Sequence, residues 1–154
     1  MEVTLRVRSL QETEELARRL APNLGAGTVV ALRGPLGVGK TTFTRALLRA
    51  LGVGGRITSP SFNIVKEYMA GDLEIYHMDV YRLEGPEDLG DLDVDRYLYG
   101  DGLTVVEWAD RVAEALPPEY LSVSMDYDTA GGNPEGRIMV LRGSSALLEG
   151  VGRG

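Results

Sequence analysis

The 154-residue sequence has no cysteine, one histidine and only two lysines against 14 arginines. The absence of cysteine excludes a disulfide framework, a thiolate zinc site and a cysteine nucleophile. No apolar run is long enough to span a bilayer, and the chain shows no signal-like leader, so we expect a cytoplasmic protein without a membrane anchor. With so few lysines, the position of Lys40 is informative.

Basic residues are fewer than acidic residues: the chain has 16 Lys and Arg and 23 Asp and Glu, which gives a formal net charge of −7. A protein that binds nucleic acid unaided normally presents a basic surface to the phosphate backbone. We therefore expect no tight, direct nucleic-acid binding. The hydrophobic share of 44% and the charged share of 25% are typical of a globular domain and argue against disorder.

Hydrophobic patterns predict strands alternating with helices. Period-2 alternation favours a strand over residues 3–7, and a continuous apolar run predicts a strand buried on both faces over residues 28–32. Helical spacing predicts helices over residues 10–20 and 41–51. The remaining expected elements are a hairpin (64–68 and 73–80), a short acidic helix from Pro86, a buried strand (103–106), a short helix (111–116) and a final hairpin (121–127 and 137–142).

Residues 34–41 fit the phosphate-binding loop pattern GxxxxGK[ST] and lie between a predicted buried strand and a predicted helix. Glycines let consecutive backbone N–H groups converge on nucleotide phosphates, and the helix N-terminus adds partial positive charge. Lys40 is expected to bridge the β- and γ-phosphates, and Thr41 to offer its hydroxyl to Mg²⁺. The predicted ATP/ADP-binding residues of this segment are Gly34, Gly37, Val38, Gly39, Lys40, Thr41 and Thr42.

The loop and the element pattern together predict an α/β fold: a P-loop NTPase-like three-layer sandwich, with a mostly parallel sheet, helices on both faces and antiparallel edge strands. We expect residues 1–142 to form a single domain and the glycine-rich residues 143–154 to form a flexible C-terminal tail. A monomer is the default oligomeric state.

Two carboxylates end predicted core strands, where α/β sheets bind their ligands. Glu107 follows the strand over 103–106 and is the candidate for holding Mg²⁺ together with Thr41. Asp79 competes with Glu107 for the metal; we assign it to orienting the attacking water or a metal-bound water, with a turn-capping role as the alternative. The predicted catalytic residues are thus Lys40, Asp79 and Glu107.

Several nearby features are less specific. His77 is expected to be a core histidine rather than a metal ligand, and Arg82 either an internal arginine finger or a partner of local acids. By strand alternation, Trp108 should point away from Glu107, into the core or toward a partner. Residues 58–62 form a hydroxyl-rich loop that is either a switch-like segment or an ordinary proline loop.

Four motifs occur in the order typical of one bacterial family. They are the phosphate loop with its doubled threonine (34–42), an SPTF-like segment (59–62), an HxDxYRL segment (77–83) and a VEW segment (106–108). Over most of its length the chain therefore resembles the TsaE (YjeE) family, the small ATPase of the pathway that installs threonylcarbamoyladenosine on tRNA. Ser61 replaces the family's usual threonine, and Ala109-Asp110 stands where proline and Glu or Gln are common, so no contact is assigned to Asp110.

The resemblance implies roles for individual residues. Thr41 and Glu107 would hold Mg²⁺, residues 37–42 the phosphates, Asp79 would lie by the γ-phosphate, and Arg137, from the family's Gly-Arg pair, would contact the nucleotide. It also implies an ATPase that is weak alone and acts with TsaB and TsaD, hydrolysing ATP to reset that complex between turnovers. The acidic composition agrees with partners that handle the tRNA.

Other functions stay open at this point. A small-metabolite P-loop kinase shares the loop, but its mobile lid normally carries arginines, and residues 84–95 carry many acids and no arginine. A small GTPase is less favoured because the chain contains no NKxD-type segment. A non-catalytic adaptor, in which bound ATP only shapes a docking face, is compatible with the same motifs.

Overall fold

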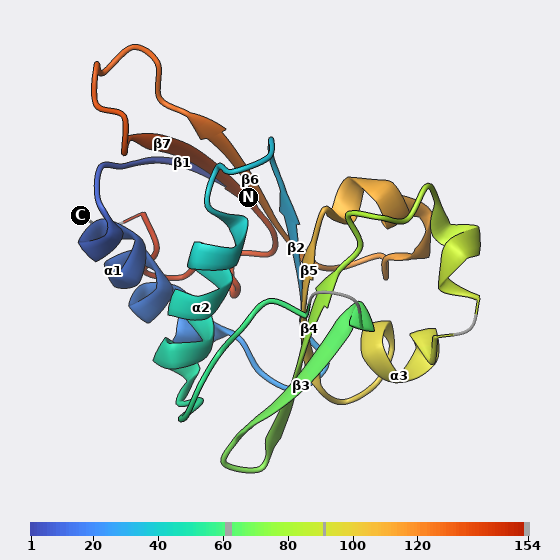
Figure 1. Ribbon diagram of the computed structural model, residues 1–154. Helices are drawn as coiled ribbons and strands as arrows, with labels where there is room; N and C mark the ends of the chain where they lie inside the picture. Colours follow the sequence, from blue (N-terminus) through green and yellow to red (C-terminus); the bar gives the residue numbers. More distant parts are fainter. Residues whose placement is uncertain (61–62, 91, 153–154) are drawn as a thin grey trace.

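Residues 1–60, 63–90 and 92–152, which the computed structural model describes, form a seven-stranded sheet between two layers of helices (Figure 1). The four central strands pair in parallel, and antiparallel strands lie at both edges. In spatial order the strands are β1 (Glu2–Val7), β7 (Arg137–Arg142), β6 (Leu121–Tyr127), β2 (Val29–Arg33), β5 (Leu103–Glu107), β4 (Leu73–Asp79) and β3 (Val65–Ala70). The predicted three-layer α/β fold is confirmed.

Helices cover both faces of this sheet. One face carries α1 (Leu10–Leu20) and α2 (Lys40–Leu51), and the other carries α3 (Val94–Leu98) with the 3₁₀ helices η3 (Pro86–Leu89) and η4 (Ala109–Ala115); a further 3₁₀ turn, η1 (Ala21–Asn23), extends α1 (Figure 1). The sequence does not predict α3, because five residues are too few to display helical periodicity. Within the described residues, no helix combines the length and the apolar character needed to cross a membrane.

β2 is buried on both faces, as its continuous apolar run predicts. Val30 and Leu32 pack into the hydrophobic cluster shared with α1 and α2, whereas Val29 and Ala31 pack into the cluster shared with α3 and η4. A strand enclosed in this way can contact a ligand only through the loop at its end. The loop that follows β2 carries the phosphate-binding motif.

The end of the chain packs against the domain over residues 143–152. Leu148 and Val151 are fully buried, and the side-chain amide of Asn23 donates to two carbonyl oxygens of this segment, at 3.0 and 2.8 Å. The structure therefore differs from the predicted flexible tail. Two apolar side chains and one amide anchor the segment, although its glycine content is high.

Candidate nucleotide site

The phosphate loop (residues 34–41) joins β2 to α2. Gly34, Gly37 and Gly39 have φ values of 153°, 77° and 115°, a region that side-chain-bearing residues rarely adopt. At Gly34 an added Cβ would also lie 2.6 Å from the carbonyl oxygen of Met125 on β6. Gly39 is the N-cap of α2, so the first N–H groups of this helix are available to a ligand in front of it.

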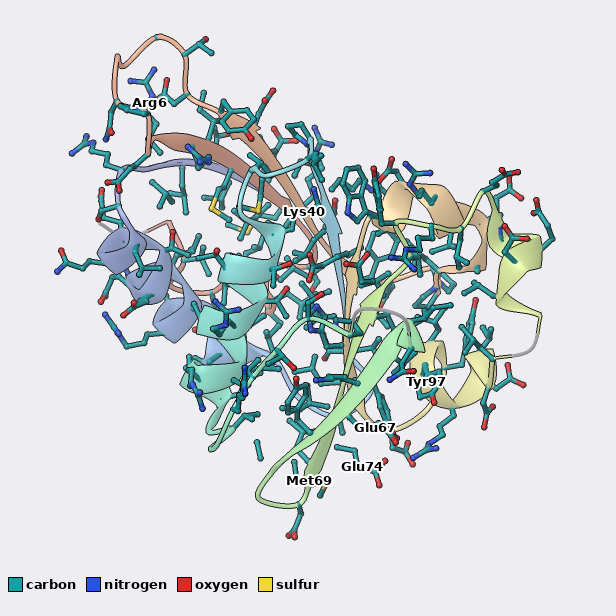
Figure 2. All side chains as sticks on the ribbon, in the orientation of Figure 1. Arg6, Lys40, Glu67, Met69, Glu74 and Tyr97 are labelled. Atoms are coloured by element: carbon teal, nitrogen blue, oxygen red, sulfur yellow. The ribbon has the colours of Figure 1, made fainter. Side chains whose placement is uncertain are left out.

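An open pocket of about 310 Å³ lies over this loop and the carboxyl ends of β4 and β5. Its lining residues are Leu36, Gly37, Gly39, Lys40, Thr41, Thr42, Asp79, Tyr81, Glu107 and Trp108. Figure 2 shows Lys40 at the end of α2 that meets the loop, whereas Glu67, Met69 and Glu74 lie on the β3–β4 hairpin. The pocket therefore gathers the loop and both predicted carboxylates at one edge of the sheet.

Glu107 is held between two partners. Its Oε1 accepts a hydrogen bond from the Thr41 hydroxyl at 2.8 Å, and its Oε2 is hydrogen-bonded to Nε2 of His77. Asp79 on β4 and Glu107 on β5 are register neighbours, so His77, two residues before Asp79, lies on the same face of the sheet. His77 is buried as predicted, but its contact with Glu107 is not apparent from the sequence.

The Lys40 ammonium group is also buried, with 5% of the residue exposed. Its Nζ donates to the carbonyl oxygens of Gly34 and Pro35, at 2.7 and 2.8 Å, and lies 3.8 Å from the centroid of the Trp108 ring. Burial lowers the pKa of Lys40, and neighbouring carboxylates, chiefly Glu107, oppose that shift. Contacts with the protein alone therefore hold the Lys40 side chain at the loop.

Asp79 lies beside Glu107 in the same pocket. Its Oδ1 accepts the backbone N–H of Tyr81 at 3.0 Å, so the side chain also caps the turn that follows β4. Burial raises the pKa of Asp79, and the nearby charge of Glu107 adds to the rise, while the Tyr81 N–H opposes it. Asp79 therefore caps the turn, as the alternative interpretation predicts, and also lines the pocket.

The raised pKa of Asp79 predicts a pH-dependent change in stability. A folded-state pKa above the unfolded value means that the folded protein binds this proton more tightly, so a charged Asp79 costs stability at pH 7. We expect Asp79→Asn to unfold at a higher urea midpoint than the wild type at pH 7 in EDTA, with the difference shrinking as the pH falls through the raised pKa. A lower midpoint for Asp79→Asn at pH 7 would mean that favourable charge contacts outweigh burial.

Trp108 does not follow simple strand alternation. The residue has a φ of 63°, in the left-handed region, directly after β5. Its ring packs against the hydrophobic cluster under η4, as alternation predicts, but it also lines the pocket together with Glu107 and contacts Tyr81, with ring centroids 4.8 Å apart. The prediction that Trp108 points away from Glu107 is therefore wrong. Strand alternation assumes extended backbone, and the left-handed conformation of Trp108 breaks that assumption.

Arg137 reaches the phosphate loop but is not among the residues that line the pocket. Its Nε donates to the carbonyl oxygen of Val38 at 2.7 Å, and its guanidinium lies 4.6 Å from the centroid of the Tyr127 ring. The Tyr127 hydroxyl in turn donates to the carbonyl oxygen of Leu36 at 2.8 Å. Arg137 therefore braces the phosphate loop from the β6–β7 hairpin, and its implied nucleotide contact stays a prediction.

Other predicted features lie outside the pocket or the described residues. Gly34 and buried Val38 shape the loop without lining the pocket. Arg82 is exposed and is not a lining residue. Of the hydroxyl-rich loop, Ser61 and Phe62 lie outside the described residues, while the Thr58 hydroxyl accepts a hydrogen bond from Lys66. Leu36, at a variable position of the phosphate-loop pattern, and Tyr81, the tyrosine of the HxDxYRL segment, complete the pocket, although the sequence assigns neither of them a role.

The donor set fits a nucleotide with Mg²⁺. Unpaired N–H groups at the start of α2 and the Lys40 ammonium suit phosphate oxygens, and the Thr41 hydroxyl beside a carboxylate suits a hard cation. Among the described residues, no group of three or more His, Cys, Asp or Glu side chains is arranged to hold a metal by itself. A cation here would therefore take its remaining ligands from phosphates and water, which is how Mg²⁺ is usually bound.

Comparisons with known proteins cover all the residues that line this pocket. The family profile described as "Threonylcarbamoyl adenosine biosynthesis protein TsaE" matches residues 7–135. The tRNA threonylcarbamoyladenosine biosynthesis protein TsaE of Bacillus subtilis (strain 168) is 44% identical over 113 residues, 73% of this chain and 70% of that protein. Its counterpart in Treponema pallidum (strain Nichols) is 41% identical over 128 residues, 83% and 93% of the two chains. The crystal structure of Bacillus subtilis YdiB superposes with a TM-score of 0.81 at 34% identity, covering 99% of this chain and 95% of that one.

Proposed function

Because this chain belongs to the TsaE family of threonylcarbamoyl adenosine biosynthesis proteins, we propose that it binds ATP with Mg²⁺ and hydrolyses it to ADP and phosphate. The activity is slow in isolation and is coupled to a TsaB- and TsaD-type complex that forms threonylcarbamoyladenosine on the adenosine next to the tRNA anticodon. The observation that carries the proposal is the 2.8 Å hydrogen bond between Thr41 and Glu107, since it joins the phosphate loop to the strand-end carboxylate.

The polar groups of the loop and of the two strand ends have separate tasks in this reaction. The backbone N–H groups of the loop and the Lys40 ammonium bind the phosphates and offset their charge. Thr41 and Glu107 would hold Mg²⁺, directly or through water, and the ion when bound neutralises charge on the β- and γ-phosphates. Asp79, beside Glu107 at the same sheet edge, orients the attacking water.

The small number of positive side chains in the pocket supports slow hydrolysis by the isolated chain. Lys40 is the one cation among the described residues that line it. In P-loop hydrolases an added arginine typically increases turnover by a factor of about 10³–10⁵. A partner that supplied or repositioned a positive charge would therefore stimulate this site strongly.

His77 is proposed as a positioning residue for Glu107. Removing a hydrogen-bond partner of a metal-holding carboxylate typically lowers activity about 10- to 100-fold. We expect His77→Ala to lower kcat for ATP hydrolysis by about tenfold while KM for ATP changes less than threefold. His77→Gln, which retains an N–H donor at a similar reach, should recover most of the loss. A fall in activity that is equal in both variants would indicate a general packing defect instead.

The experiment that tests the proposed function is phosphate release from Mg·ATP by the purified chain, alone and with the TsaB and TsaD counterparts from the same genome. Stimulation by the pair is the expected result. ATP binding without phosphate release under either condition would contradict an ATPase and favour the adaptor function. A phosphorylated metabolite as the product, in place of free phosphate, would favour the kinase.

A further inference from the structure

Side-chain charge is distributed unevenly along the chain. Residues 1–56 carry nine Lys and Arg and four Asp and Glu, a net charge of +5, whereas residues 57–154 carry seven basic and 19 acidic residues, a net charge of −12. Both α1 and α2 belong to the basic part, and together they cover one face of the sheet (Figure 1). Within this part, α1 and α2 together carry four arginines and one lysine against three glutamates, a net charge of +2, which favours an acidic ligand on this side.

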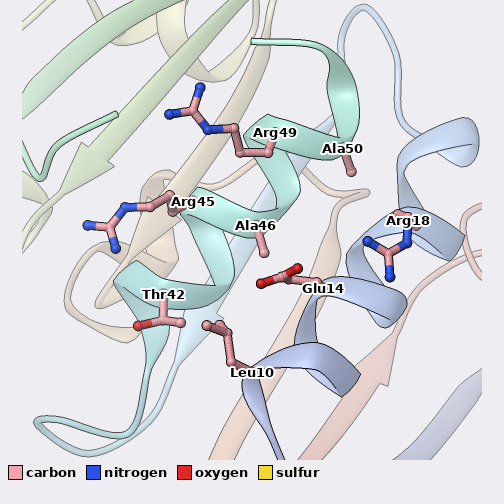
Figure 3. A pocket seen from close by; sticks show the side chains of 8 residues that line it. All are labelled: Leu10, Glu14, Arg18, Thr42, Arg45, Ala46, Arg49 and Ala50. Atoms are coloured by element: carbon pink, nitrogen blue, oxygen red, sulfur yellow. The ribbon is translucent and has the colours of Figure 1, made fainter. Parts of the chain in front are cut away.

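An open groove of about 530 Å³ runs between these two helices (Figure 3). The residues that line this α1–α2 groove are Leu10, Glu14, Arg18, Thr42, Arg45, Ala46, Arg49 and Ala50. Leu10 is 56% exposed, and Figure 3 shows Ala46 and Ala50 pointing from α2 toward α1. The groove therefore combines an apolar centre with three arginines and one glutamate, a net charge of +2.

Two of these arginines have no carboxylate partner among the described residues. Arg45 donates through Nε to the carbonyl oxygen of Ile57 at 3.4 Å, and Arg49 donates through Nη1 to that of Val53 at 3.0 Å. A guanidinium group has five N–H donors, so most donors of both side chains are available to a ligand. By contrast, Arg18 forms an ion pair with Glu15 at 3.0 Å.

We propose that the α1–α2 groove docks an acidic segment of the protein complex to which ATP hydrolysis is coupled. This inference rests on the proposed function. Carboxylates of the segment would pair with Arg45 and Arg49, which project from one flank of α2, and an apolar side chain would cover Leu10 between the helices (Figure 3). A nucleic-acid backbone would satisfy the arginines, but it would leave the apolar side chain of Leu10 uncovered.

The groove is continuous with the nucleotide pocket through Thr42, which lines both. Thr42, Arg45, Ala46 and Arg49 follow one face of α2 at helical spacing, and the N-terminus of this helix forms part of the phosphate loop. A segment bound along this face contacts the same helix that holds the phosphates. Docking there therefore has a direct physical route to the nucleotide site.

The test compares the wild type with Arg45→Glu/Arg49→Glu in binding to the purified TsaB and TsaD counterparts by titration calorimetry in 0.15 M NaCl. We expect the variant to bind at least about tenfold more weakly, because two charge contacts become repulsive. The matched control is Arg6→Glu/Arg142→Glu, which reverses two exposed arginines on β1 and β7; its Kd should stay within threefold of the wild type. Leu10→Ser should also weaken binding.

Four results would overturn the proposal. The first is an unchanged Kd for Arg45→Glu/Arg49→Glu, and the second is no binding of the complex by the wild type. The third is a parallel loss of ADP affinity, which would assign the groove to the nucleotide. The fourth is a wild-type tRNA gel shift that this variant loses while it still binds the protein complex. Basal phosphate release by the same variant should match the wild type, and absence of release by the wild type would count against the proposed function alone.

Discussion

Glu107→Gln should lower the rate of ATP hydrolysis at least about 100-fold while ADP binding stays within about threefold of the wild type. Glutamine keeps the size of the side chain and can still accept the Thr41 hydrogen bond, but it removes the negative charge that would hold Mg²⁺ at the end of β5. Loss of one such electrostatic contact typically raises the barrier by about 2.7–4 kcal/mol, or 10²- to 10³-fold in rate. Phosphate release and ADP titration measure the two quantities.

The matched control for this prediction is Glu67→Gln. Glu67 lies on the β3–β4 hairpin, is half exposed and pairs with Arg96, so its neutralisation changes net charge equally without touching the pocket. The rate of the control should stay within twofold of the wild type. Wild-type turnover by Glu107→Gln would show that the metal assignment is wrong and would direct attention to Asp79.

Lys40→Ala should abolish measurable phosphate release, a loss of 10³-fold or more, and should also weaken ATP binding. Among the described residues that line the pocket, Lys40 is the only lysine or arginine, so its removal leaves the phosphates without a side-chain cation there. Its Nζ also holds two carbonyl oxygens of the phosphate loop, at 2.7 and 2.8 Å, so the variant loses part of the loop's internal support. Single-turnover phosphate release and ATP titration report the two effects.

Lys66→Ala provides the control, because Lys66 is the one other lysine in the sequence. Its side chain donates to the Thr58 hydroxyl and does not line the pocket. Circular dichroism of Lys40→Ala should retain the wild-type signal, since the Lys40 backbone stays in α2. Hydrolysis by Lys40→Ala at more than a tenth of the wild-type rate would remove the phosphate loop from the proposed mechanism.

Short sequence patterns are sufficient to predict much of this fold and of the candidate site. The phosphate loop, the strand before it and the helix after it are specified by neighbouring residues, because glycine conformations, caps and periodicity act over a few positions. Glu107 and Asp79 can be predicted as site candidates for the same reason: each ends an apolar strand, and strand ends of parallel sheets form ligand sites. The α/β fold follows from the alternation of these elements.

Contacts between residues far apart in the chain depend on the tertiary structure. The order of β4 and β5 brings His77 to Glu107, the left-handed turn at Trp108 brings its ring beneath Lys40, and the β6–β7 hairpin directs Arg137 to the loop backbone. The burial of Leu148 and Val151 near the end of the chain likewise depends on distant partners. The free energy of packing between distant segments determines the strand order, the direction of side chains at strand ends and the packing of the terminus. These contacts produce no periodic pattern in the sequence. The phosphate-loop motif is therefore predictable from the sequence alone, whereas the partners of each charged group are not.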